Sequence, residues 1–192
     1  MSINTTFSTT IFDTRWTTFR RNSYVQAPQK WRQWLCNRGS LTEHLINASG
    51  GDFKVLVHRQ QWLLPHRSEA KVLGLKPRQV ALIREVKLIG RDQTYVFART
   101  VVPLSTLTGR QKQLSRLGTR ALGSLLFSDP SLRRGKFQTS LLTSDNKQKS
   151  WARRSVFYLS DKPLLVCEMF LPILENIAYT PPMLPSRSIL GD

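Results

Sequence analysis

The chain has 192 residues, of which 40% are hydrophobic and 21% are charged. This length and composition are typical of one globular domain, and no apolar segment is long enough to cross a bilayer as a helix. The formal net charge of +17, from 29 Lys and Arg against 12 Asp and Glu, allows three kinds of partner: nucleic acid, an anionic membrane surface or a small anionic ligand.

The basic residues are scattered along the chain, and no zinc finger, helical recognition motif or aromatic platform for nucleic acid accompanies them. Cys36 and Cys167 lie too far apart in sequence to form a metal-ligand pair, and the three histidines have no metal-site spacing. We therefore expect no nucleic-acid partner, no metal and a reducing compartment.

Residues 1–27 are rich in Ser and Thr and contain arginines but no apolar block, which excludes a secretory signal. Transit peptides share this composition, but we expect a flexible N-terminal arm. The domain follows over residues 28–172. Residues 173–192, with three prolines, are expected to form an irregular C-terminal tail.

Two short helices are predicted within residues 28–46, separated at residues 37–39. Ser40 is the expected N-cap of the second helix, and Glu43 stands three residues later as in a capping box. Residues 53–58 alternate as a strand. Residues 60–77 contain two prolines and a glycine, and we expect them to form a long connection that covers a site.

Two strands follow at residues 80–89 and 94–102, joined by a hairpin turn over residues 90–93. In the first strand, Arg84 shares its face with three apolar side chains. In the second, Arg99 shares its face with Tyr95, Phe97 and Val101. A lone arginine on an apolar face usually extends its charged end to solvent, but two of them on paired strands indicate a buried anion site.

Helices are predicted at residues 105–117 and 121–127, and a second hairpin pairs residues 151–160 with residues 163–172 across a turn at Asp161 and Lys162. Glu168 interrupts the otherwise apolar last strand. A buried carboxylate must pair with a cation, accept hydrogen bonds or remain protonated. Hairpins separated by helices predict an α+β domain with an antiparallel sheet.

Two inward arginines are suited to a ligand with two carboxylates, because each guanidinium grips a carboxylate bidentately. A partly buried carboxyl beside them can accept a hydrogen bond or transfer a proton. The apolar surroundings favour a ring, so these residues predict a pocket for a small, cyclic, anionic acid.

The same residues lie in segments that resemble chorismate pyruvate-lyase (4-hydroxybenzoate synthase). The order and spacing of the segments carry the resemblance, which covers about 70% of the chain from Trp34 to Pro172. The segments are Gly39-Ser40-Leu41-Thr42, Arg84-Glu85-Val86, Arg99-Thr100-Val101-Val102-Pro103, Ser105-Thr106-Leu107, Leu117-Gly118, Leu122-Gly123, Leu126-Phe127, Trp151, Arg153-Arg154-Ser155, Lys162-Pro163-Leu164-Leu165, Glu168 and Phe170-Leu171-Pro172.

The resemblance implies a sheet of about six antiparallel strands and a ligand enclosed beneath two helical flaps. It also implies a lyase that eliminates pyruvate from chorismate to leave 4-hydroxybenzoate, a precursor for quinone synthesis, in the cytoplasm and without a cofactor. Arg84, Leu41, Glu168 and the backbone around Leu122 match the family's ligand contacts, and Arg99 matches its second arginine. We expect Arg84 to bind the ring carboxylate, Arg99 to face the enolpyruvyl group, Glu168 to bond the 4-hydroxyl, and the protein to be a monomer.

Three alternatives stay open. The same fold resembles the effector-binding domain of bacterial transcription regulators, so the chain is alternatively a non-catalytic sensor of small aromatic acids, although residues 1–33 are too short for a winged helix. The net charge of +17 alone would favour a nucleic-acid-binding protein. The third alternative is a lyase of this kind that releases 3-hydroxybenzoate instead of the 4-isomer, or that acts on a related acid.

Overall fold

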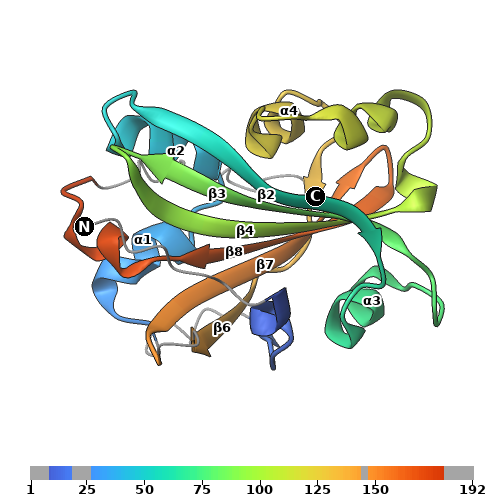
Figure 1. Cartoon of the computed structure of the whole chain (residues 1–192), viewed down its shortest axis with the longest axis horizontal. Helices are drawn as coiled ribbons and strands as arrows, with labels where there is room; N and C mark the ends of the chain where they lie inside the picture. Colours follow the sequence, from blue (N-terminus) through green and yellow to red (C-terminus); the bar gives the residue numbers. More distant parts are fainter. Residues whose placement is uncertain (1–8, 19–26, 144–146, 180–192) are drawn as a thin grey trace, which may run out of the picture.

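A computed structural model of the chain describes residues 9–18, 27–143 and 147–179. One antiparallel sheet runs through the molecule, with the strand order β1-β6-β7-β8-β4-β3-β2 and with β5 paired to β7 (Figure 1). Its six longer strands confirm the predicted fold class. They are β2 (Phe53–Leu63), β3 (Ala81–Gly90), β4 (Gln93–Pro103), β6 (Gln138–Thr143), β7 (Lys149–Leu159) and β8 (Lys162–Phe170).

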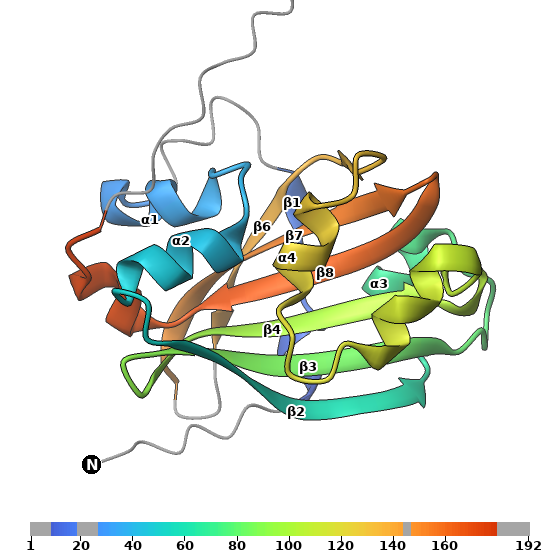
Figure 2. The ribbon, with the colours of Figure 1, turned by 90° about the horizontal axis from the view of Figure 1, so that it is seen from above.

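Helices cover the sheet on both faces, and Figure 2 shows most of them on one side. We call this side the pocket face; it carries α1 (Gln29–Leu35), α2 (Leu41–Ala48) and α4 (Leu122–Phe127), which pack on Val86, Phe170 and Val166. We call the other side the back face; Leu73 of α3 (Arg67–Leu73) packs there. Residues 60–63 continue β2 instead of forming a connection, and α3 within the remaining segment packs on the back face, so the expectation that residues 60–77 cover a ligand site is wrong.

The two helices predicted within residues 28–46 are present as α1 and α2. Ser40 caps α2 as expected, because its Oγ accepts a hydrogen bond from the Glu43 backbone N–H at 3.4 Å. Residues 105–117 are not an α-helix; the chain forms 3₁₀ segments there, η3 (Leu104–Thr106) and η4 (Gly109–Arg116). Gly109, the first residue of η4, has φ of +58°, and this left-handed conformation prevents a continuous helix through residues 105–117.

Both predicted hairpins form with two-residue turns. Arg91 and Asp92 connect β3 to β4, and their φ angles of 47° and 57° are those of a type I′ turn. Ser160 and Asp161 connect β7 to β8 in the same way, with φ of 47° and 65°. The second turn lies one residue earlier than predicted, and this pairs Glu168 with Arg153 rather than with Ser155.

The domain extends further at both ends than residues 28–172. The segments η1 (Thr9–Phe12) and β1 (Thr17–Thr18) pack on the sheet, and Phe12 is fully buried with its ring stacked 5.9 Å from Phe97. At the other end, Leu174 of η5 (Pro172–Asn176) is fully buried. The remaining parts of the expected arm and tail, residues 1–8, 19–26 and 180–192, lie outside the described residues.

The short strand β5 (Arg133–Arg134) completes the sheet by pairing with β7. Each helix in the described part of the chain is too short or too polar to span a bilayer.

Candidate active site

A pocket of about 570 Å³, its open mouth included, lies between the pocket face of the sheet and the helices α2 and α4. Its floor follows from the strand register. Arg84 of β3, Thr100 of β4 and Val166 of β8 stand side by side in one row, and Val86, Ala98 and Glu168 form the next row. Arg84 and Glu168 therefore stand two strands apart, about 10 Å across the sheet. The small side chains of Ala98 and Thr100 separate them, which leaves a shallow, flat floor between two charges.

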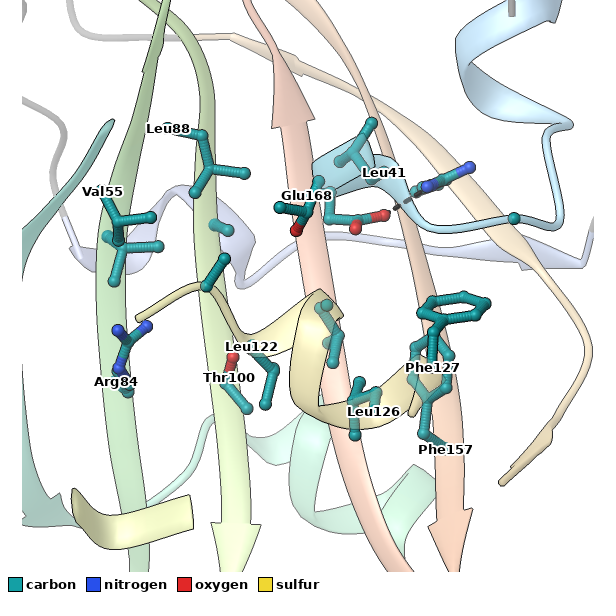
Figure 3. Close-up of a pocket in the computed structure, with 18 of the residues that line it drawn as sticks. Leu41, Val55, Arg84, Leu88, Thr100, Leu122, Leu126, Phe127, Phe157 and Glu168 are labelled. Atoms are coloured by element: carbon teal, nitrogen blue, oxygen red, sulfur yellow. Dashed lines mark hydrogen bonds and ion pairs between the residues drawn. The ribbon is translucent and has the colours of Figure 1, made fainter. Parts of the chain in front are cut away.

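Apolar side chains close the pocket from above, as Figure 3 shows. Leu41 comes from α2, and Leu122 and Leu126 come from α4, which crosses over the strands. The two helices meet at Gly123, where an added Cβ would lie 2.4 Å from Thr42 Oγ1. The glycine that weakens α4 is thus the residue that lets α4 approach α2 and complete the cover.

Arg84 is a buried cation without an acidic partner among the described residues. Its side chain is 3% exposed, and Nη2 donates to the carbonyls of Gly118 and Arg120 at 2.8 and 3.2 Å. Its Nε is buried and has no hydrogen-bond partner. Burial lowers the pKa of Arg84. A buried guanidinium with an unused N–H is a ready site for a carboxylate.

Glu168 is paired with an arginine that the sequence prediction did not include. Arg153 Nε donates to Glu168 Oε2 at 2.5 Å (dashed line at Glu168 in Figure 3), and Arg153 is 1% exposed. Arg153 Nη1 also donates to the carbonyls of Trp34 and Asn37, each at 2.8 Å. Arg153 therefore fixes the Glu168 carboxylate and ties the segment after α1 to the sheet. A correctly placed turn between β7 and β8 would have revealed this pair from the sequence.

Arg134 is the third arginine in the pocket lining, and it was also missed. It lies on β5 opposite Phe157. Its guanidinium carbon stands 4.0 Å from the ring centre of Phe137 and 4.7 Å from that of Phe157. Its sequence neighbourhood, Arg133-Arg134-Gly135-Lys136, has the composition of a solvated surface run and gave no signal of burial.

The expectation that Arg99 faces the substrate is wrong. Arg99 points to the back face, where its Nε and Nη2 donate to Glu69 at 2.8 and 3.0 Å and its Nη1 donates to Glu85 at 2.6 Å. Burial lowers the pKa of Arg99, but the hydrogen bonds and charges of Glu69 and Glu85 outweigh this and raise it. Arg99 is thus fully used in a buried ion-pair cluster on the side of the sheet away from the pocket.

A β-bulge explains why the Arg99 side chain lies on the opposite face of the sheet from the one predicted. The turn pairs Gly90 with Gln93, and continuing this register would place Arg99 directly opposite Arg84. The pairing shifts by one residue after Ile89 and Thr94, so that Tyr95 is left unpaired and Leu88 faces Val96. A one-residue shift turns every later side chain of the strand to the other face.

The pocket contains three arginines and one glutamate, so it carries an excess of two positive charges at neutral pH. Across the described residues, no group of three His, Cys, Asp or Glu side chains could hold a metal ion. Four of the five residues predicted from the sequence, Leu41, Arg84, Leu122 and Glu168, line this one pocket. Their arrangement suits a flat, anionic, cyclic ligand held at two ends.

Comparisons with known proteins show what this chain is similar to. A family model described as chorismate lyase matches residues 14–178. A protein of Methylococcus capsulatus named probable chorismate pyruvate-lyase is 39% identical over 75% of this chain and 96% of its own length. A protein of the same name from Psychromonas ingrahamii is 41% identical over 72% of this chain and 81% of its own length.

Among solved structures, the chain is similar to a GntR-family transcriptional regulator from Bacillus cereus, with a TM-score of 0.50 at 11% identity over 70% of this chain and 99% of that one. It is also similar to PhnF from Mycobacterium smegmatis, with a TM-score of 0.50 at 17% identity over 71% of this chain and 65% of that one. At these identities the likeness shows the fold alone.

Proposed function

The chain belongs to the chorismate lyase family, and we propose on this basis that it cleaves chorismate to 4-hydroxybenzoate and pyruvate. The observation that carries the proposal is Arg84, a buried cation with an unused N–H and no acidic partner among the described residues, at one end of a floor that has Glu168 at the other. A ring with a carboxylate at one end and a hydroxyl opposite matches this spacing.

In this proposal, Arg84 binds the ring carboxylate. The guanidinium is held in place by the Gly118 and Arg120 carbonyls, so little conformational freedom is lost when the carboxylate binds. The described part of the protein leaves its Nε–H without an acceptor, and the guanidinium, which lines the pocket, donates to the carboxylate of the ligand. The apolar side chains of Val86, Leu122 and Leu126 contact the ring and exclude water.

Glu168 accepts a hydrogen bond from the 4-hydroxyl group. Its Oε2 is occupied by Arg153, while among the described residues no hydrogen bond occupies its Oε1. The salt bridge to Arg153 holds the carboxylate in one orientation, so Oε1 presents a fixed acceptor to the ring. Leu41 and Leu122 lie above the ring, one on each covering helix.

The reaction breaks the bond between ring carbon 3 and the ether oxygen, and ring carbon 4 loses its hydrogen as a proton. The electron pair of the broken bond leaves with enolpyruvate, which becomes pyruvate when its methylene carbon takes up one proton. Aromatisation of the ring supplies the driving force, so the protein has to hold the dianion in a reactive geometry and stabilise charge on the leaving group. These steps use no cofactor.

The test is incubation of the purified protein with chorismate, without metal or nucleotide. We expect pyruvate and 4-hydroxybenzoate in equal amounts, with chromatography separating the 4-isomer from the 3-isomer. Arg84→Gln is expected to weaken 4-hydroxybenzoate binding about 10- to 100-fold, because a charge-assisted hydrogen bond is lost. A wild-type protein that binds 4-hydroxybenzoate but releases no pyruvate would instead favour a sensor of small aromatic acids, the alternative that the fold itself permits.

We further propose that the product is a precursor for quinone synthesis, that the protein acts as a monomer and that it works in the cytoplasm. The chorismate lyase family supports the first proposal. Cys36 and Cys167 are both free thiols, which suits a reducing compartment. Size-exclusion chromatography with light scattering tests the monomeric state.

A further inference from the structure

Chorismate carries two carboxylates, and the displacement of Arg99 to the back face leaves the second one without the expected partner. Arg84 binds one carboxylate in the proposed function. The charge of Arg153 is already compensated, because its Nε is paired with Glu168, and its Nη1 donates to the Trp34 and Asn37 carbonyls. Of the three arginines that line the pocket, Arg134 is then left.

Within the described part of the chain, the contacts of Arg134 hold its guanidinium in place but do not include a salt bridge. No acidic side chain of the described residues lies within salt-bridge distance of its guanidinium. Its Nε donates to Ser155 Oγ at 3.3 Å and its Nη1 to the Arg38 carbonyl at 3.5 Å, and both contacts are long. The guanidinium also makes cation–π contacts with the rings of Phe137 and Phe157.

The surroundings of Arg134 also favour an incoming anion. Burial, followed by the positive charge of Arg153, lowers the pKa of Arg134 to about 9, so the side chain remains charged at neutral pH in a site that disfavours its charge. A bound carboxylate would offset both effects, since it would place a counter-charge directly on the guanidinium. The charge of Glu168 offsets these effects only in part, because that carboxylate forms its salt bridge with Arg153 and not with Arg134.

We infer that Arg134 binds the carboxylate of the enolpyruvyl side chain and thereby distinguishes chorismate from the product. This inference rests on the proposed function of the same site. Arg134 on β5 and Glu168 on β8 line the side of the pocket where these strands pair with β7. Arg84 lines the opposite side, on β3. In chorismate the enolpyruvyl ether and the 4-hydroxyl are on adjacent ring carbons. A ring carboxylate on Arg84 and a hydroxyl on Glu168 thus direct the side-chain carboxylate toward Arg134.

Arg134 then has a role in the reaction as well as in binding. The leaving group keeps its carboxylate and gains a further negative charge on the ether oxygen as the bond breaks. A cation bound to that carboxylate lies close to the developing charge and stabilises it. 4-Hydroxybenzoate has only the ring carboxylate, so it makes no ion pair with Arg134. Once pyruvate has left, Arg134 therefore does not hold the product in the site.

The test compares substrate kinetics with product binding in Arg134→Gln. We expect kcat/KM for chorismate to fall about 10- to 100-fold, because a charge-assisted pair is lost, while the Kd for 4-hydroxybenzoate changes by less than about threefold. Retained product binding also shows that the variant is folded. Arg133→Gln is the matched control: it is the preceding residue of β5, it is exposed, and it pairs with Asp161 at the surface.

An unchanged kcat/KM in Arg134→Gln would overturn the inference. So would a parallel loss of chorismate turnover and 4-hydroxybenzoate affinity, since that result would assign Arg134 to the fold or to the ring carboxylate. If the wild-type protein released no pyruvate, the proposed function would fail separately. Equilibrium binding of chorismate and 4-hydroxybenzoate to both proteins would then decide the role of Arg134: a selective loss of chorismate binding supports it, and an equal loss or no loss overturns it.

Discussion

Two buried arginines on neighbouring strands are expected to respond in opposite ways to the same substitution. Arg99→Met removes the partner of Glu69 and Glu85, whose side chains are both fully buried. Removing one partner of a buried ion pair costs about 3–5 kcal/mol, because the remaining charge is buried without compensation. Arg84→Met removes a cation that has no acidic partner among the described residues, so no buried carboxylate is left behind.

The contacts that remain set the size of each effect. In Arg99→Met, Glu69 still accepts a hydrogen bond from the His66 backbone at 2.9 Å, and Glu85 still lies 3.2 Å from Arg59. We therefore take the lower end of the range, about 3 kcal/mol, which lowers Tm by about 6–12 °C in a protein of this size. Arg84→Met loses two hydrogen bonds to carbonyls of exposed residues, which water can replace. Its Tm should change by less than about 4 °C.

The assay combines thermal unfolding with activity at a temperature where both variants are folded. Arg99→Met should retain most of its turnover and its affinity for 4-hydroxybenzoate, whereas Arg84→Met should lose product affinity. Adding Glu69→Gln and Glu85→Gln to Arg99→Met should restore part of the Tm, because the uncompensated charges are gone. An Arg99→Met protein with unchanged Tm and greatly reduced turnover would refute the reasoning, because it would place Arg99 at the substrate.

Three further predictions follow from the cover, the titration and the charge of the protein. Gly123→Ala should raise the Kd for 4-hydroxybenzoate, because the added Cβ would lie 2.4 Å from Thr42 Oγ1 and push α2 away from α4. Isothermal titration calorimetry measures this Kd. Thr42→Ala, combined with Gly123→Ala, should restore the affinity. Burial and the charge of Arg153 lower the pKa of His44 below 6.5, so the folded protein keeps this residue neutral while the unfolded chain binds a proton. The free energy of unfolding should therefore fall as pH drops below 6.5, and this group contributes at most about 1.4 kcal/mol per pH unit to the fall. His44→Gln should reduce the decrease in Tm between neutral and mildly acidic buffer. An identical decrease in both proteins would contradict the assignment. With a net charge of +17, the KM for dianionic chorismate should rise with added salt while kcat changes little, since the Debye length shrinks from about 10 Å at 0.1 M to about 3 Å at 1 M; a KM independent of salt would exclude electrostatic attraction of the substrate.

Local features of the sequence predicted most of the elements that build the pocket. The capping residue Ser40, the turn at residues 90–93 and the apolar run around Glu168 act over a few neighbouring residues, and the structure contains the helix, the hairpin and the buried carboxylate that they indicate. The alternation of side chains along β3 likewise placed Arg84 with Val86 and Leu88 on one face. Each of these features depends on backbone geometry and burial, which a short stretch of sequence specifies.

The tertiary structure alone decided which charges meet. Strand register is cumulative, so one unpaired residue at Tyr95 moved Arg99 from the pocket to Glu69 and Glu85 on the back face, and nothing in the local pattern of β4 marks that bulge. A turn shifted by one residue likewise gave Glu168 the partner Arg153. Arg134 reached the pocket because β5 pairs with β7, a contact between segments more than 20 residues apart. Charge pairing depends on distances across the sheet, and those distances are fixed only when all the strands have paired.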